Sequence, residues 1–272
     1  MKRIIDLPLK LGRLGLSYEK QGNALTLGGI SFGTKLQARH LNGDGKVMDE
    51  IDLGSGLVTN IGVLALANDM NWAAPSGAAV NLFKMLRYHA SGIGATAAAA
   101  TDYKLQTVSA AGGQTPVAGT QVFTPADNLQ KIVSVATIAY TATEAVTEWG
   151  WFNDATLSRA TGSPFTATSA TGGTGTAAAL TASSTIVKGE QQNVVETTTT
   201  PRIGLITSNT TSALVIPNWL VATTGVTGST PGATEAYALR PVMWDHKVFA
   251  AINVVNGDSI QFTYSLTISS GG

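Results

Sequence analysis

Two short glycine motifs are the parts of this chain that most resemble catalytic or cofactor-binding sequences. Gly29-Ile30-Ser31-Phe32-Gly33 matches G-x-S-x-G, which presents a nucleophilic serine where a strand turns sharply into a helix. Residues 34–41 instead continue a strand pattern, so Ser31 is not predicted to be a nucleophile. Gly92-Ile93-Gly94-Ala95-Thr96-Ala97 matches G-x-G-x-x-A. A dinucleotide fold also needs a helix and, about twenty residues on, an acid. The region from Gly112 to Phe123 offers no such acid and little helix, so we interpret this motif as a turn that lets chain segments pack closely.

Metal-ligating and titratable side chains are also poorly spaced for chemistry. Asn42-Gly43-Asp44-Gly45 resembles part of a calcium loop, but the first and twelfth ligand positions would be His40 and Ile51, which do not suit calcium. A hairpin turn is the expected structure, because Asn-Gly and Asp-Gly adopt positive φ readily. Asp245 and His246 are adjacent, and adjacent side chains of a strand point to opposite faces. This aspartate is therefore not expected to orient this histidine.

The remaining candidates are two glutamates and a group of tryptophans. Glu144 and Glu148 would lie on one face of a strand about 13 Å apart, too far for shared proton chemistry, and we expect both to be solvated. Trp149 and Trp151 are expected to be core anchors or the centre of a subunit contact. Together with Trp219 they are also the residues that a carbohydrate-binding module would use. The sequence thus predicts no catalytic, cofactor-binding or metal-binding residue.

Composition restricts the function classes further. The 272 residues include 17 basic and 17 acidic side chains, so no charge-driven affinity for nucleic acid or an anionic membrane is expected. The absence of cysteine excludes a disulfide framework, a thiolate zinc site and a cysteine nucleophile. Asp6, Lys10 and Arg13 interrupt the apolar run near the N-terminus, so this segment does not have the pattern of a signal peptide. We expect it to be an extended arm or a first strand.

Alternating apolar and polar residues predict a mostly β fold. The clearest alternation is at 259–268, and further core strands are predicted near 131–141, 146–153 and 242–255. The last two strands of the chain are expected to pair with each other around Asn256-Gly257-Asp258. Because such strands bury one face only, a second sheet or another subunit must cover that face. We therefore predict an antiparallel β-sandwich or jelly-roll-like domain.

Other segments complete this prediction. One short α-helix is expected near residues 55–70, with Ser55 as its N-cap. A hairpin is expected from 34–41 and 46–51, and a strand from 82–88.

The predicted domain organisation has two parts. Residues 1–50 are expected to form an N-terminal arm and β-hairpin, and residues 51–272 the β-sandwich domain. Residues 161–235 are rich in Thr, Gly and Ala, but apolar residues recur through them. We expect this segment to be a β insertion made of hairpins.

Four stretches also carry a family resemblance. They read "DLGSGLVTNIGVLALAND", "NLFKMLRYHASGIGATAAAATDYKLQT", "VTEWGWFND" and "LRPVMWDHKVFAAINVVNGDSIQFTYSLTISSGG". In this order they resemble a widespread family of tailed-bacteriophage virion structural proteins, over residues 50–155 and 238–272. The closing motif, Val248 to Ile268, is the most specific part. The insertion at 161–235 departs from the compact pattern of that family, so the resemblance does not define its surface or partner.

The resemblance implies a structural component of a tailed-phage virion, assembled in the host cytoplasm. The expected role is a capsid decoration (cement) protein that bridges and stabilises capsomers. Its expected partners are the major capsid protein and copies of itself, as a homo-oligomer; no cofactor, nucleic acid, membrane or small-molecule substrate is expected, and no enzyme activity. A neck, tail or fibre protein is the alternative within this class. A carbohydrate or host-receptor binding module is an alternative from another class.

Overall fold

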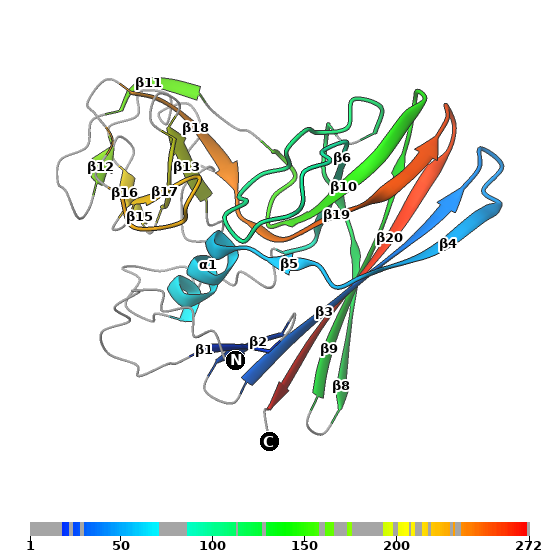
Figure 1. The fold of residues 1–272 in the computed structure, drawn as a ribbon, viewed down its shortest axis with the longest axis horizontal. Coiled ribbons are helices and arrows are strands. Elements are labelled where there is room, and N and C mark those ends of the chain that lie inside the picture. The colour runs from blue at the N-terminus through cyan, green and yellow to red at the C-terminus, as the bar shows by residue number, and fades with distance from the viewer. Residues whose placement is uncertain are drawn as a thin grey trace.

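The protein is a mostly β structure with one helix among its described residues. The computed structural model describes residues 18–21, 24–27, 30–70, 86–112, 114–126, 129–157, 161–165, 173–175, 193–197, 201–206, 208–209, 214–216, 219–228, 231 and 235–270. Every strand pairing within these ranges is antiparallel. A seven-stranded and a five-stranded sheet form a β-sandwich, and two further sheets of five and three short strands lie beside it (Figure 1). The predicted fold class is confirmed.

The larger sheet of the sandwich has seven strands in the order β1-β2-β3-β20-β9-β8, with β4 also beside β3. Their bounds are β1 (Tyr18–Gln21), β2 (Ala24–Leu27), β3 (Ile30–Leu41), β4 (Val47–Gly54), β8 (Thr120–Ala126), β9 (Leu129–Ala139) and β20 (Ser259–Ser270). The C-terminal strand β20 is central, because it pairs over its length with β3 on one side and β9 on the other. The hairpin predicted from 34–41 and 46–51 corresponds to β3 and β4. The residues before β1 lie outside the described part of the chain.

The second sheet of the sandwich has five strands in the order β5-β19-β10-β6-β7. Their bounds are β5 (Leu57–Val58), β6 (Tyr88–Gly92), β7 (Val117–Ala118), β10 (Glu144–Phe152) and β19 (Met243–Val254). Most of the strand predicted at 82–88 lies outside the described residues, and Tyr88 begins β6.

Aromatic side chains fill the space between the two sheets. Every second residue of β20 from Ile260 to Leu266 is fully buried, whereas the residues between them are partly exposed on the opposite face. The ring of Tyr264 lies 4.4 Å from Trp151 and 5.2 Å from Trp149 between centroids. The period-two pattern of β20 therefore marks the face that packs on the second sheet of the sandwich.

Strands β19 and β20 do not pair, so the prediction of a final hairpin is wrong. β19 pairs with β10 and β5, and the 255–258 turn carries the chain across to the other sheet. Asp258 accepts a hydrogen bond from the N–H of Val255 at 3.0 Å and lies 3.0 Å from His40 Nε2. The turn is also bound by backbone hydrogen bonds between Tyr140 and both Gly257 and Asp258. The sequence pattern identified both strands but carried no information on which strands they pair with.

The helix α1 (Asn60–Met70) begins later than predicted. Its N-cap is Thr59, whose hydroxyl oxygen accepts the N–H of Gly62 at 3.0 Å, and not Ser55. The reason is that Leu57 and Val58 form β5 and pair with β19, which delays the start of the helix. Gly62 permits close packing, since a Cβ there would lie 3.0 Å from the Trp244 backbone. No helix in the described residues is long and apolar enough to cross a membrane.

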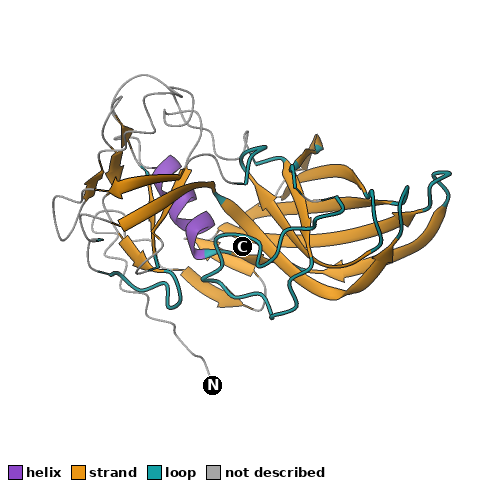
Figure 2. Ribbon diagram, turned by 90° about the horizontal axis from the view of Figure 1, so that it is seen from above, coloured by secondary structure: helices purple, strands orange, loops and turns teal. Residues whose placement is uncertain are grey.

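The insertion and the strand that follows it contribute two small sheets. One has the order β11-β18-β13-β14-β17 and the other β12-β16-β15. The bounds are β11 (Thr161–Phe165), β12 (Gly173–Gly175), β13 (Asn193–Thr197), β14 (Arg202–Leu205), β15 (Ser208–Asn209), β16 (Leu214–Ile216), β17 (Trp219–Val221) and β18 (Glu235–Pro241). Ile203 and Leu205 of β14 are buried in the same apolar cluster as Ile61 and Ala65 of α1. The helix thus lies between the insertion strands and the sandwich (Figure 2).

Candidate functional site

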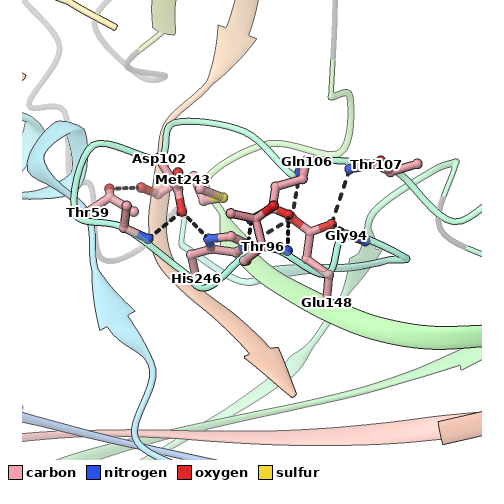
Figure 3. Close-up of polar contacts among 10 residues, drawn as sticks. Thr59, Gly94, Thr96, Asp102, Gln106, Thr107, Glu148, Met243 and His246 are labelled. Atoms are coloured by element: carbon pink, nitrogen blue, oxygen red, sulfur yellow. Dashed lines mark hydrogen bonds and ion pairs between the residues drawn. The ribbon is translucent and has the colours of Figure 1, made fainter. Parts of the chain in front are cut away.

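The densest group of titratable side chains lies on the outer side of the second sandwich sheet, the one that contains β19 and β10. His246 of β19 is fully buried, and its Nδ1 lies 2.7 Å from Asp102 Oδ2 while its Nε2 lies 2.8 Å from Glu148 Oε1 (Figure 3). Glu148 of β10 is also fully buried, and Asp102 comes from the loop that follows β6. A histidine between two carboxylates is the arrangement here that most resembles an acid–base site.

Glu148 also holds the loop from residue 93 to residue 107 against the sheet. Its carboxylate accepts backbone N–H groups from Gly94 at 3.1 Å, Gln106 at 2.6 Å and Thr107 at 3.2 Å (Figure 3). Asp102 in turn accepts the N–H of Ala99 at 2.7 Å. The prediction that Glu148 is solvated is therefore wrong. The loop folds over this strand and replaces water with backbone donors, which the spacing of the two glutamates could not reveal.

His246 is an imidazolium at neutral pH. Burial alone would lower its pKa, but the hydrogen bonds and charges of Asp102 and Glu148 outweigh burial and raise the pKa to about 9. Both ring nitrogens then donate, one to each carboxylate. A base needs a free nitrogen near neutral pH, and this ring has neither nitrogen free. The hydrogen bonds of this cluster hold the loop against the sheet, and they occupy both ring nitrogens of His246.

A second histidine, His89 of β6, lies in the sandwich core beside a serine. Its Nε2 lies 2.8 Å from Ser134 Oγ, and Trp149 Nε1 donates to its Nδ1 at 3.2 Å. Burial lowers the pKa of His89 to about 3, so the ring is neutral. Because Nδ1 accepts from Trp149, Nε2 carries the proton and donates to Ser134. This tautomer cannot take a proton from the serine, so the pair lacks the arrangement of a nucleophile and its base.

Asp245 and His246 point to opposite faces of β19, as adjacent strand residues should. Asp245 is fully buried between the sheets and accepts a hydrogen bond from the Tyr264 hydroxyl at 2.8 Å. Burial raises the pKa of Asp245 to about 6, although the hydrogen bond from Tyr264 lowers it. The aspartate therefore belongs to the core and does not orient the histidine.

The glycine motifs lie in structural elements. Ser31 is near the start of β3, which continues to Leu41, so no helix follows it as a nucleophile elbow requires. Gly92 ends β6, and a Cβ there would lie 2.4 Å from Thr107 O and 2.5 Å from Glu148 Oε2. The second motif is therefore a point of close backbone packing.

The Asn42-Gly43-Asp44-Gly45 segment is the turn between β3 and β4. Asn42 Oδ1 accepts the N–H groups of Asp44 at 3.1 Å and Lys46 at 2.9 Å. Gly45 has a φ of 75°, which glycine adopts without strain. No group of three His, Cys, Asp or Glu side chains suited to a metal occurs among the described residues.

The tryptophans named as a carbohydrate platform are inside the protein. Trp149 and Trp151 have no exposed surface, and Trp219 is 2% exposed. A sugar platform needs an accessible ring face, so these three residues do not form one in this fold.

A further charged cluster joins the insertion to the loop that follows β6. Glu196 of β13 accepts hydrogen bonds from the Tyr103 hydroxyl at 2.5 Å and from Lys104 Nζ at 2.5 Å, and it also pairs with Arg240 of β18. Burial opposes ionisation, but these hydrogen bonds outweigh it and lower the pKa of Glu196. The cluster therefore stays ionised and fastens the small sheet to the sandwich.

A small pocket in the described part of the chain lies beside this cluster. Lys104, Leu105, Phe152 and Arg240 contribute to its lining, and its interior volume is about 30 Å³. Pockets that hold metabolites typically have roughly 300–1,000 Å³. The pocket is thus too small for such a ligand.

Sequence reasoning missed Asp102, Ser134 and Glu196. Each is joined to its partner across a long stretch of chain: Asp102 is 144 residues from His246, and Glu196 is 44 residues from Arg240. The one local signal was the rarity of charge, with 12% charged residues. A scarce ionisable residue inside a strand pattern, such as Glu148 or Glu196, is a candidate for a buried pair.

Comparison with known proteins finds no matching family model, no matching curated protein and no matching solved structure.

Proposed function

We propose that the protein is a structural component of a tailed-phage virion, and specifically a capsid decoration (cement) protein. In this role it bridges neighbouring capsomers through contacts with the major capsid protein and with copies of itself. Many weak contacts per particle then act together, so that the shell is stabilised by avidity. The sequence resemblance over residues 50–155 and 238–272 supports the proposal.

The structural observation that carries the proposal is that the clustered ionisable side chains bind one another and neighbouring segments of the chain. His246, Glu148 and Asp102 bind one another and a loop, His89 has both ring nitrogens engaged, and Glu196 fastens the insertion. These groups hold segments of the chain together, and the pocket beside Glu196 in the described part of the chain is too small for a metabolite. Such an arrangement favours a protein that acts through rigid surfaces.

The outer face of the seven-stranded sheet is available for such contacts. Exposed side chains on it include Lys35 and Gln37 of β3 and Lys131 and Thr137 of β9. In the described part of the chain, the second sandwich sheet packs on the inner face of the seven-stranded sheet and leaves its outer face uncovered. A broad, mixed polar face on a rigid sandwich suits contact with a shell.

The experiment that tests the proposal is the location and copy number of the protein on a purified particle. Closed icosahedral shells carry a decoration protein in hundreds of copies, whereas a neck or tail ring carries about a dozen or fewer. Hundreds of labelled copies spread over the capsid would support cement. About a dozen at one vertex would favour the neck or tail alternative, and absence from the particle would refute a virion role.

The N-terminal segment is the first contact region to test. The first thirteen residues include Lys2, Arg3, Lys10 and Arg13, a local basic group in a chain with little charge. Deletion of residues 1–20 is expected to lower particle occupancy. Undiminished occupancy would exclude the segment as a contact, while leaving the location test of the whole protein unaffected.

A further inference from the structure

The two outer borders of the seven-stranded sheet differ in charge. Edge strands expose unpaired backbone groups that can pair with another chain, and charged side chains usually guard them. Edge strand β4 carries Asp49, Glu50 and Asp52. The opposite edge strand, β8, reads Thr-Gln-Val-Phe-Thr-Pro-Ala and has no charged residue. Among the described residues, one border of the sheet therefore carries charged side chains, whereas edge strand β8 at the other border (Figure 1) carries none.

Edge strand β8 also exposes two large apolar side chains. Val122 is 54% exposed and Phe123 is 60% exposed. Val122 lies opposite Val133 of β9 and Phe123 lies opposite Ile132, so the two side chains point to opposite faces of the sheet. Both faces therefore present apolar surface at the same border.

The β8 edge is held in place before any partner arrives. All seven of its residues pair with β9, and the Gln121 side chain donates to the Leu86 carbonyl at 2.5 Å. Gly119, just before β8, packs so tightly that a Cβ would lie 2.3 Å from Ser134 Oγ. A partner strand would meet a preformed edge, which lowers the entropy cost of pairing.

We propose that β8 pairs in antiparallel fashion with β8 of a second copy of this chain, around a two-fold axis at Val122. In such an isologous contact each residue meets its symmetry mate or a residue of the same strand. Self-pairing therefore requires a strand that does not repel itself, and uncharged β8 meets this condition. Self-pairing of β4 would bring the carboxylates of two copies together.

The chosen register follows from Pro125. Proline has no backbone N–H to donate to a ladder, so pairing is confined to residues 120–124. With Val122 opposite itself, Thr120 faces Thr124 of the second copy and Gln121 faces Phe123. The two seven-stranded sheets then become one continuous sheet, with both apolar side chains covered at its centre.

The contact deepens the proposed function by naming the surface through which copies bind each other, but the dimer is expected whether or not the virion assignment holds. The interface is small, so the dimer should be weak and dependent on concentration. Analytical ultracentrifugation of the full chain at concentrations up to about 1 mM would detect a dimer with a dissociation constant up to the millimolar range. We expect monomer at low concentration and dimer at high concentration.

Lysine substitutions test the edge directly. Val122→Lys combined with Phe123→Lys should weaken dimerisation by at least about tenfold in Kd, because lysines guard an edge. Met48→Lys on β4 is the matched control, since Met48 is 60% exposed, like Phe123, and it should leave Kd unchanged. Circular dichroism and the melting temperature would verify that the variants remain folded.

A cysteine cross-link tests the register. The chain has no cysteine, so Val122→Cys introduces a single thiol, and directly opposed strand residues lie close enough for a disulfide. We expect rapid dimeric cross-linking from Val122→Cys and little from Met48→Cys. A wild-type protein that stays monomeric up to about 1 mM would overturn the proposal, and so would a dimer that the lysine pair leaves intact or equal cross-linking from both thiols.

Particle occupancy separates this proposal from the proposed function. Suppose that the wild-type protein is a monomer in solution and that the variant with both lysines occupies fewer sites on the particle. Strand β8 would then receive a strand of another protein, and the assignment of a second copy as the partner would be wrong. A dimer in solution together with absence from the particle would support the β8 contact and refute the virion role.

Discussion

Deprotonation of His246 should destabilise the protein in mildly alkaline solution. The imidazolium ring lies between Asp102 and Glu148 with both nitrogens donating. Loss of its proton leaves two carboxylates close together, one of which is fully buried, and removes one of the two hydrogen bonds. A rise in pH is therefore enough to destabilise the folded protein, and no substitution is needed.

The magnitude follows from the pKa. The folded-state pKa of His246 is about 9 against an ordinary value of 6.5. The proton is therefore held more tightly in the folded state. The resulting stability is fully present below pH 6.5 and is lost as the pH rises through about 9. At 1.36 kcal/mol per pKa unit the loss amounts to about 3 kcal/mol.

Urea unfolding followed by tryptophan fluorescence would measure this loss. The free energy of unfolding should fall by about 3 kcal/mol between about pH 6 and about pH 9.5, a range that ends below the ordinary tyrosine pKa of about 10. His246→Gln should abolish most of this step, and His40→Gln should retain it, because the His40 ring hydrogen-bonds Asp258 and is not part of the cluster of His246, Asp102 and Glu148. A wild-type free energy that is constant within about 0.5 kcal/mol, or a step that survives in His246→Gln, would refute the reasoning.

Three further substitutions test the core. Burial raises the pKa of Asp245 to about 6 from 3.8, so stability should fall by about 3 kcal/mol as the pH rises from about 3 to about 7; Asp245→Asn should remove this dependence in the same urea titration. Gly92→Ala should cost about 1–3 kcal/mol because its Cβ would lie 2.4 Å from Thr107 O, whereas Gly33→Ala, with its nearest contact at 3.9 Å, is the control that should change stability little. Trp151→Ala should cost about 3–5 kcal/mol in thermal or chemical unfolding, since the ring is fully buried, and a near-neutral effect would contradict its place in the core.

Much of the strand content could be predicted because the alternation of apolar and polar residues is local. The pattern at 259–268 predicted β20, and those near 131–141 and 146–153 predicted β9 and β10. The helix was found but its start was wrong, because Leu57 and Val58 pair with β19. A strand pairing formed with residues far along the chain overrode a plausible local N-cap.

The polar interior could not be predicted in the same way. Glu148 reads as a solvated strand residue, but the loop that supplies its hydrogen-bond donors begins more than fifty residues earlier, with Gly94 at a separation of 54. Only the folded chain shows that three N–H groups and an imidazolium converge on this carboxylate. A buried carboxylate is tolerated because it is paired and hydrogen-bonded, and no local pattern encodes such a set of partners.

The sequence alone predicted antiparallel strands and one helix, both of which occur among the described residues, and it excluded thiol chemistry, because these properties depend on residue type and on neighbours within a few positions. The tertiary structure decided that β19 and β20 lie in opposite sheets, that His246 is held as a cation, and that one sheet edge is guarded by charge and the other is not. Those features depend on contacts between residues far apart in the chain, 144 positions for Asp102 and His246 and 218 for His40 and Asp258, and the energy of such contacts exists only once the two sheets and the loop have come together.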